Sequence, residues 1–153
     1  MAASNKRIKN NKAPQGNKIL TGGSPDKYYN SHPSWRFSTC DREAWSLFST
    51  KPKDIFWDEI LPRLKNLETQ TWSDILVNAK KQNHLINIPS LSKTAVDRLN
   101  ELMLELDSII SLRLTGTHRI YGFMDGSTFN ILWVDLNHGD NKDCVCRSYK
   151  KHT

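Results

Sequence analysis

The stretch that decides the fold is Ser108–His138, "SIISLRLTGTHRIYGFMDGSTFNILWVDLNH", in which two turn signals separate three runs of strand-forming residues. Asp125-Gly126 lies between two aromatic-rich runs. Asp-Gly favours a two-residue type I′ hairpin turn, because this turn requires positive φ at both central positions. The stretch therefore predicts a three-stranded antiparallel meander over residues 108–136.

The register of the second hairpin follows from this turn. A two-residue loop at Asp125-Gly126 pairs Ile120 with Ile131, and counting by twos from this pair separates an apolar face from a mixed face. The apolar face holds Ile120, Met124, Phe129, Ile131 and Trp133, and the mixed face holds Arg119, Tyr121, Phe123, Thr128, Asn130 and Leu132. We expect the mixed face to be open or only partly covered.

The first hairpin can be read with a loop of two or three residues within Thr115-Gly116-Thr117. The three-residue loop, with its glycine in the left-handed region, places Arg113 beside Arg119. The shorter loop turns Arg113 towards the core, where an unpaired charge is costly, so we favour the longer one. Two adjacent arginines then share the mixed face with Tyr121, and His138 points the same way if the last strand keeps its phase.

Four segments ahead of the meander repeat apolar residues at helical spacing and are expected to be helices: residues 41–48, 52–68, 71–80 and 92–107. Pro62 should kink or divide the second helix, and Ser90 or Ser92 should cap the last. Trp35 and Phe37 alternate as in a short strand or an extended strap. The order predicts an α+β fold with several N-terminal helices packed on one face of a small C-terminal antiparallel sheet, and leaves open an added N-terminal strand.

Length and charge indicate one domain with basic ends. The chain has 153 residues and a net charge of +6; eight basic residues lie in residues 1–20 and after residue 143, which leaves 14 basic against 16 acidic side chains in between. We expect a disordered basic tail over residues 1–27, a single α+β domain over 28–143 and a basic C-terminal tail over 144–153. These tails either contact nucleic acid or an acidic partner, or are solvated arms that aid solubility. The candidate nucleic-acid-binding residues are Lys6, Arg7, Lys9, Lys12, Arg147, Lys150 and Lys151.

No apolar run approaches the roughly 20 residues of a membrane span, so we expect a cytoplasmic protein without membrane contact. Cys40, Cys144 and Cys146 make an odd count that fits reduced thiols. Cys-x-Cys together with His138 and His152 is a weaker zinc pattern than paired Cys-x-x-Cys, and we expect no metal and no cofactor. The absence of a glycine-rich phosphate loop leaves nucleotide-binding classes without support.

The segment "AVDRLNELMLEL", followed by the quoted stretch, resembles the C-terminal half of the RelE/ParE-like toxin superfamily over about residues 92–140. The shared features are a strand ending in a basic residue and a small turn, a second strand with Arg119-Ile120-Tyr121, an acidic-Gly turn, and a third apolar strand leading to His138. The first ninety residues find no match in that family, which is usually smaller. The resemblance therefore describes an enlarged and divergent member.

The resemblance implies a toxin of a toxin-antitoxin system that cleaves mRNA without metal, usually on the ribosome, and that has a cognate antitoxin as partner. Such an endoribonuclease uses the neighbouring ribose 2′-hydroxyl as nucleophile. By position and face, Arg113 and Arg119 would clamp the phosphate, His138 would act as acid or base, and Tyr121 would stack on a base or donate a proton.

Each of these residues also has an ordinary explanation, because strand arginines are mostly solvated, tyrosines often lie at the rim of a core and histidines are common in turns. Two other functions stay open. One is a non-catalytic protein-binding module of the same fold, as in the ParE-like branch. The other is a nucleic-acid-binding or partner-binding protein that uses its basic tails.

Overall fold

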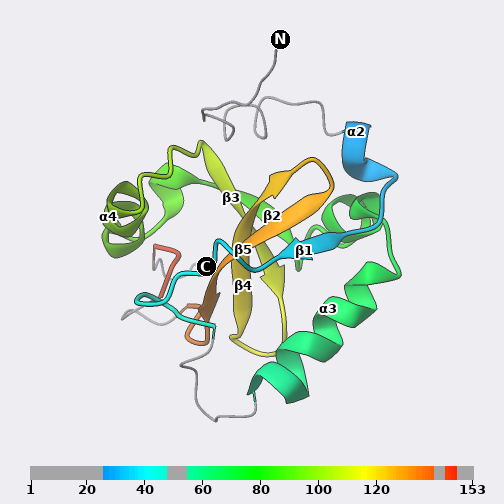
Figure 1. Ribbon diagram of the computed structural model, residues 1–153, viewed down its shortest axis with the longest axis horizontal. Helices are drawn as coiled ribbons and strands as arrows, with labels where there is room; N and C mark the ends of the chain where they lie inside the picture. The colour runs from blue at the N-terminus through cyan, green and yellow to red at the C-terminus, as the bar shows by residue number, and fades with distance from the viewer. Residues whose placement is uncertain (1–25, 48–54, 140–143, 148–153) are drawn as a thin grey trace.

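The computed structural model describes residues 26–47, 55–139 and 144–147. Its centre is one five-stranded sheet in the order β1-β5-β4-β3-β2, in which β1 runs parallel to β5 and the other pairs are antiparallel (Figure 1). The strands are β1 (Ser34–Arg36), β2 (His84–Asn87), β3 (Ser108–Arg113), β4 (Arg119–Asp125) and β5 (Thr128–Asp135). The α+β class and the central meander are therefore confirmed.

Two short strands extend the meander at its edges. The N-terminal strand that the sequence left open is β1, and it places Trp35 beside Phe129 of β5. At the opposite edge, β2 pairs with β3 and places His84 beside Ser111. The sequence does not predict β2, because a four-residue segment carries too little alternation to identify a strand.

The helical elements are short. They are α2 (Asp26–Tyr29), the π-helical turns η2 (Phe56–Ile60) and η3 (Asp74–Asn78), α3 (Leu61–Glu68), the 3₁₀ turn η4 (Ile88–Ser90) and α4 (Lys93–Glu101). The second predicted helix runs without a break past Pro62; it changes from the π-helical turn η2 to α3 just before this residue, and Ile60 and Leu61 both keep right-handed helical angles. Ser92 caps α4, with its hydroxyl accepting a bond from the Ala95 amide at 3.1 Å.

The helix predicted for residues 41–48 is wrong over 41–47, the part that the structure describes. Asp41 does accept bonds from the amides of Glu43 and Ala44, as a capping residue would. However, Trp45 has φ of 45°, which interrupts a right-handed helix. The segment forms a bent connection instead.

The first hairpin has the predicted three-residue loop. The Leu114 amide bonds the His118 carbonyl at 3.0 Å, and Gly116 has φ of 50°. Arg113 lies directly opposite Arg119, as expected. This register keeps the leucines of β3 in the core and the arginines on the other face.

The turn of the second hairpin lies one residue later than expected. Gly126 and Ser127 form the loop, with φ of 63° at Gly126, which glycine adopts without steric cost. The pairing is shifted by two residues, so Ile131 lies opposite Gly122 instead of Ile120. A shift of two leaves the faces unchanged, because the side-chain period of a strand is two residues.

A bulge then changes one face assignment. The register slips between Tyr121 and Gly122, so that Tyr121 lies opposite Trp133 and β5 holds one extra residue. Trp133 therefore joins Leu132 and Tyr121 on the second face, and Val134 takes the place expected for Trp133. The predicted apolar-face position of Trp133 is wrong.

Gly122 lies next to this bulge for a steric reason. A Cβ atom on Gly122 would meet the backbone oxygen of Asn130 and the ring of Phe129. Only a residue without a side chain lets the two strands approach so closely here.

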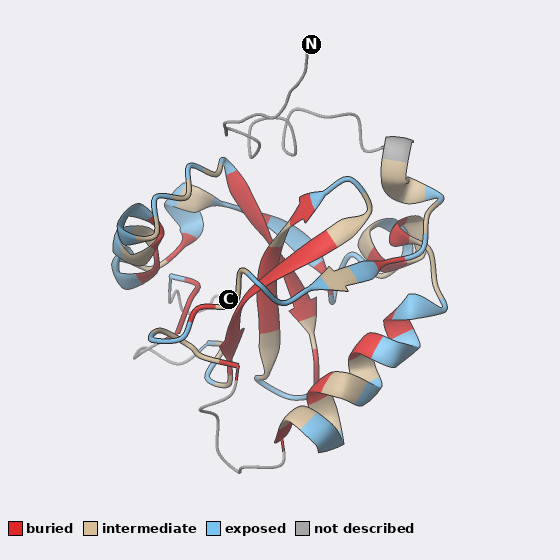
Figure 2. Ribbon diagram, viewed as in Figure 1, coloured by how far each residue is buried: buried red, intermediate tan, exposed pale blue. Residues whose placement is uncertain are grey.

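Both faces of the sheet are covered, and Figure 1 shows α3 and α4 on opposite sides of it. Ile120 and Ile131 share one core with residues of η2, α3 and η3, whereas Leu99 of α4 packs with Tyr121 and Trp133 on the other face. The prediction that the helices share one face is therefore wrong. Figure 2 shows the buried residues concentrated in the three central strands.

The folded part extends beyond residue 143. Val145 is fully buried, its amide bonds Asp135 Oδ2 at 2.7 Å, and its carbonyl accepts from the Ser92 amide at 2.8 Å. The expected domain boundary at residue 143 is therefore too early, because residues 144–146 belong to the core. The basic residues Lys6, Arg7, Lys9, Lys12, Lys150 and Lys151 lie outside the described residues. Within the described ranges, the structure contains no helix with the length and hydropathy of a membrane span.

Candidate functional site

Two rows of paired residues bring the predicted site residues to one face. Arg113, Arg119 and Asp135 lie opposite one another on β3, β4 and β5. The adjoining row, two residues along each strand, is formed by His84, Ser111, Tyr121 and Trp133. Directly paired residues, and residues two apart, share a face of a sheet. The two rows therefore lie side by side on the face that α4 partly covers.

His138 completes this group from beyond the end of β5. Its amide bonds the Thr117 carbonyl at 3.0 Å, and the Thr117 hydroxyl bonds the Leu136 carbonyl at 2.7 Å. These bonds hold the segment after β5 against the first hairpin loop. There the His138 Nδ1 atom lies 3.2 Å from Tyr121 Oη. All four residues proposed from the sequence are thus neighbours in space, and we call Arg113, Arg119 and His138 the cationic corner.

The two arginines are held differently. Arg119 donates from Nη1 to the carbonyls of Gly116 at 2.7 Å and His118 at 3.0 Å. The backbone of Arg113 is fixed by Asn83 and Arg63, but its guanidinium makes no hydrogen bond or ion pair with any described residue. Arg113 therefore has all its donors available.

The charges of the cationic corner are not neutralised by ion pairs. No carboxylate of the described ranges lies within ion-pair distance of Arg113 or Arg119, and Asp135 directs its oxygens to backbone amides. Burial, followed by the charge of Arg113, lowers the pKa of Arg119. Two adjacent like charges repel each other, and an anion between them would relieve this repulsion.

Tyr121 is fully buried at the centre of the site face. Its hydroxyl contacts His138 Nδ1 and Cys146 Sγ, both at 3.2 Å. Burial, with a smaller contribution from Cys146, raises its pKa well above the ordinary range, so the phenol stays protonated. A ring with no exposed surface cannot stack on a base, and the stacking role expected for Tyr121 is therefore wrong. Its hydroxyl remains able to act through His138.

His138 is half-buried, and its pKa is lowered to about 4. Burial is the largest cause, followed by the charges of Arg119, His84 and Arg113. With this pKa the imidazole is neutral at pH 7. A bound anion would oppose the effect of the arginines and raise the pKa of His138.

Sequence reasoning missed two members of the site. Cys146 was assigned to a tail, because a run of only three residues gives no periodic signal. His84 lies outside every predicted element, yet the structure places it, exposed, in the row that contains Tyr121. Leu85 and Ile86 are adjacent, so β2 shows no apolar alternation in the sequence. Arg147, the one described member of the predicted nucleic-acid-binding set, bonds the Pro89 carbonyl through Nη2 at 2.9 Å.

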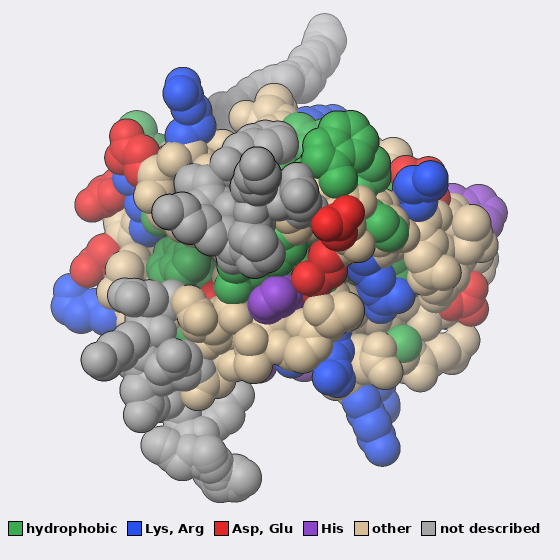
Figure 3. Space-filling view, turned by 90° about the horizontal axis from the view of Figure 1, so that it is seen from below, with side chains coloured by type: hydrophobic (Ala, Val, Ile, Leu, Met, Phe, Trp, Pro, Cys, Tyr) green, Lys and Arg blue, Asp and Glu red, His purple; other side chains and the backbone are tan. Residues whose placement is uncertain are grey.

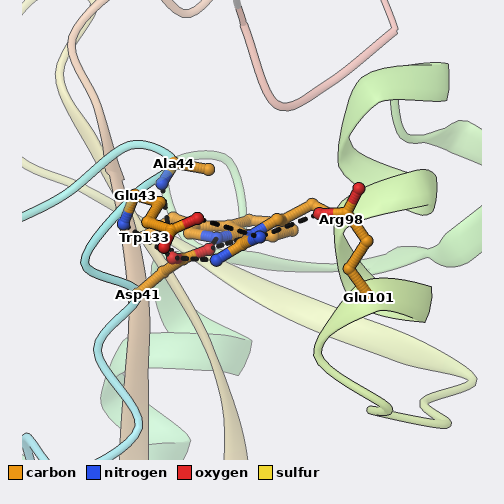
Figure 4. A network of polar contacts seen from close by, with 6 residues as sticks. All are labelled: Asp41, Glu43, Ala44, Arg98, Glu101 and Trp133. Atoms are coloured by element: carbon orange, nitrogen blue, oxygen red, sulfur yellow. Dashed lines mark hydrogen bonds and ion pairs between the residues drawn. The ribbon is translucent and has the colours of Figure 1, made fainter.

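A second charged group stabilises the fold on the same face, where α4 packs against Trp133 (Figure 4). Arg98 of α4 donates from Nε and Nη2 to the two carboxylate oxygens of Asp41 at 2.7 and 2.8 Å, and Trp133 Nε1 donates to Asp41 at 3.0 Å. Burial alone would raise the pKa of Asp41, but these bonds hold it well below its usual range. The acceptors of Asp41 are occupied by protein groups, so we assign this network a structural role.

A third group ties η2 to the first hairpin loop. Glu59 of η2 accepts from the Thr115 hydroxyl at 2.5 Å and lies 2.8 Å from His118 Nδ1. Because His118 precedes Arg119 by one residue, it points to the opposite face of the sheet. This group fixes the loop that carries the Arg119 contacts, and it does not belong to the cationic corner.

The described residues contain no group of three or more His, Cys, Asp or Glu side chains that could hold a metal ion. Figure 3, which views the molecule from below, shows acidic and basic side chains interspersed on that surface. This fits the near-neutral charge of residues 21–143. The cationic corner is thus a local feature on a body of mixed charge.

No family model, curated protein or solved structure matches this chain. The fold and the site define an α+β protein with a half-exposed cationic corner backed by a buried tyrosine.

Proposed function

We propose that this chain is a toxin-like protein of a toxin-antitoxin system that acts as a metal-independent endoribonuclease on mRNA. The observation that carries the proposal is the cationic corner itself. Arg113 and Arg119 lie side by side without a carboxylate partner among the described residues, next to the neutral imidazole of His138. Two unneutralised guanidinium groups form a site for a phosphate, the group that such an enzyme must stabilise.

Each residue has a role in attack by a ribose 2′-hydroxyl on the adjacent phosphate. Arg113 offers its whole guanidinium to the phosphate oxygens, and Arg119 offers Nε and Nη2 while Nη1 remains on the hairpin loop. These cations would stabilise the negative charge that gathers on the phosphate in the transition state. His138, held by Tyr121, would exchange a proton or a hydrogen bond with the reacting oxygens. Every role is supplied by a side chain, so the reaction requires no metal.

The toxin assignment rests on the resemblance of residues 92–140 to the RelE/ParE-like superfamily. By that resemblance, the partners are RNA or the ribosome and a cognate antitoxin protein, and the site of action is the cytoplasm. The cationic corner lies within the segment that carries the resemblance, which is why we prefer the nuclease to the non-catalytic module of the same fold.

The test is growth of a host cell on induction of the wild type, Arg119→Ala and Arg119→Lys, with RNA cleavage followed in the presence of EDTA. Removing one cation from a developing phosphate charge should slow cleavage by about 10²–10³-fold. Lysine should rescue only partly, because it lacks the planar fork that engages two oxygens. Arg36→Ala is the matched control, since Arg36 is a strand arginine at the β1 edge that pairs with Asp125.

Circular dichroism separates the possible outcomes. A folded, inactive Arg119→Ala protein supports the site. A folded variant that remains toxic rejects the nuclease and favours the non-catalytic binding module. If Arg36→Ala and Arg119→Ala lose activity equally, the effect is one of general charge, and the cationic corner is not the site.

A further inference from the structure

The cationic corner continues across the sheet towards the β2 edge. His84 is an exposed residue of β2, and its pairing with Ser111 puts it in the row that contains Tyr121. His84 therefore lies on the same face as Arg113 and Arg119. It is also near enough to His138 for its charge to contribute to the lowered pKa of that residue.

The distance from Arg113 to His84 suits a ligand with more than one phosphate. Arg113 is two residues along β3 from Ser111, and His84 is one strand further, so their Cα atoms are about 8 Å apart by strand and sheet spacings. This is of the order of the separation between neighbouring phosphates in an extended single strand.

The chain next to His84 carries positive charge without acids. Residues 75–96 contain Lys80, Lys81, His84 and Lys93 and no Asp or Glu. Lys93 pairs with Asp97, whereas the exposed Lys80 and Lys81 have no ion pair within the described part of the chain. The Lys80 carbonyl lies 3.3 Å from His84 Nδ1, which keeps this segment beside the imidazole.

We propose that the site takes single-stranded RNA spanning at least two phosphates, with one phosphate at Arg113 and Arg119 and the next over the β2 edge at His84 and Lys81. The choice of RNA rests on the proposed function, whereas the path rests on the face shared by His84, Arg113 and Arg119 and on the exposed Lys81 three residues before His84. On this path, His84 and Lys81 contribute to the affinity for a polynucleotide but not to the affinity for a mononucleotide. Basic side chains along a surface can follow a nucleic-acid backbone without reading its sequence.

The experiment compares two probes on the full-length chain. The first is a fluorescein-labelled, 2′-O-methylated oligouridylate of about 12 nucleotides, which cannot be cleaved and exceeds the length of the path. The second is uridine 3′-monophosphate, which carries one phosphate. Binding is measured by fluorescence anisotropy and competition at several salt concentrations. The variants are His84→Ala, Lys81→Ala and Arg113→Ala.

Two matched controls remove the same groups elsewhere. Lys65→Ala removes an exposed lysine from α3, which covers the other face of the sheet. His32→Ala removes a histidine whose Nδ1 contacts a backbone carbonyl, that of Gln70, much as His84 contacts that of Lys80. Both controls should bind both probes as the wild type does.

The expected result is a several-fold loss of oligouridylate affinity in His84→Ala and Lys81→Ala, with mononucleotide affinity unchanged. Lys81→Ala should also reduce the slope of log K against log salt by about 0.7, the value for one lost contact with a single strand. Arg113→Ala should weaken both probes. A merely structural role for His84 would change both probes together and leave the salt slope unchanged.

Other outcomes overturn the proposal in distinguishable ways. If only Arg113→Ala weakens binding, the ligand is confined to the cationic corner; the path is then wrong and the proposed function stands. If polyglutamate of equal charge competes as well as the oligouridylate, the surface takes an acidic protein and not RNA. If the wild type and Arg113→Ala bind the oligouridylate equally, both the path and the proposed function fail.

Discussion

Tyr121 Oη lies 3.2 Å from His138 Nδ1, and this contact joins a fully buried residue of β4 to a half-exposed residue beyond β5. Cys146 Sγ lies at the same distance from the Tyr121 hydroxyl. If the thiol donates to the phenol oxygen, the phenol can donate to the imidazole, and each proton has an acceptor. In that arrangement His138 accepts at Nδ1 and carries its proton on Nε2, on the side of the ring away from Tyr121.

Acid should destabilise the fold through His138. Its pKa is about 4 in the folded protein, against an ordinary value of 6.5 for the unfolded chain, so the unfolded chain binds a proton more readily. The stability contribution of the neutral imidazole is complete above pH 6.5 and is lost as pH falls towards 4. After allowance for solvent screening of a half-exposed ring, the loss is on the order of 1–2 kcal/mol.

Urea unfolding at pH 7 and pH 4.5 measures this loss in the free energy of unfolding. His138→Gln should lose clearly less stability over the same interval, and an equal loss would mean that His138 is not the responsible group.

The two arginines of the cationic corner should differ in their contribution to stability. Arg113→Ala removes a guanidinium without a partner in the described structure and relieves repulsion, so the change should stay within about 0.5 kcal/mol of zero. Arg119→Ala removes two bonds to loop carbonyls and should cost about 1–2 kcal/mol. Thermal unfolding of the two variants, side by side, measures the difference. Equal destabilisation by the two changes would show that the Arg113 guanidinium also makes a stabilising contact.

Trp133→Ala and Leu132→Ala should both be severely destabilising. The bulge puts both side chains on the second face, where their exposed fractions are 0% and 1%. Truncating a buried tryptophan costs about 3–5 kcal/mol and a buried leucine about 2–5 kcal/mol. Denaturant unfolding is the measurement, and Leu85→Ala, at a position 59% exposed on β2, is the control. A mild effect of Leu132→Ala would mean that Leu132 lies on an open face, as the sequence predicted.

Asp41→Asn should be among the most damaging conservative changes. The Asp41 carboxylate has no exposed side-chain surface and accepts from Arg98 and Trp133, so the change leaves Arg98 without its main partner. Breaking such a buried pair costs about 3–5 kcal/mol. Asp97→Asn is the matched control, because Asp97 pairs with Lys93 at the surface and should contribute at most about 1 kcal/mol. Similar melting temperatures for the two variants would contradict the assigned role of the network.

The sequence by itself determined the features that depend on neighbouring residues. The loop around Gly116 and the cap at Ser92 are set by local steric and hydrogen-bonding rules. The pairing of Arg113 with Arg119 follows from that loop, which is why the arginines of the site could be named in advance.

Only the tertiary structure decided the features that depend on distant contacts. Loops at Asp125-Gly126 and Gly126-Ser127 preserve the same faces, so side-chain alternation cannot distinguish them, and the bulge beside Gly122 forms where two strands approach too closely for a Cβ atom. On the face that it covers, α4 packs against Tyr121 and Trp133, and Arg98 bonds Asp41, 57 residues away. The burial of Cys146 and the position of His84 depend likewise on packing across the sheet, because neither residue lies in a segment long enough to carry a periodic signal of its own.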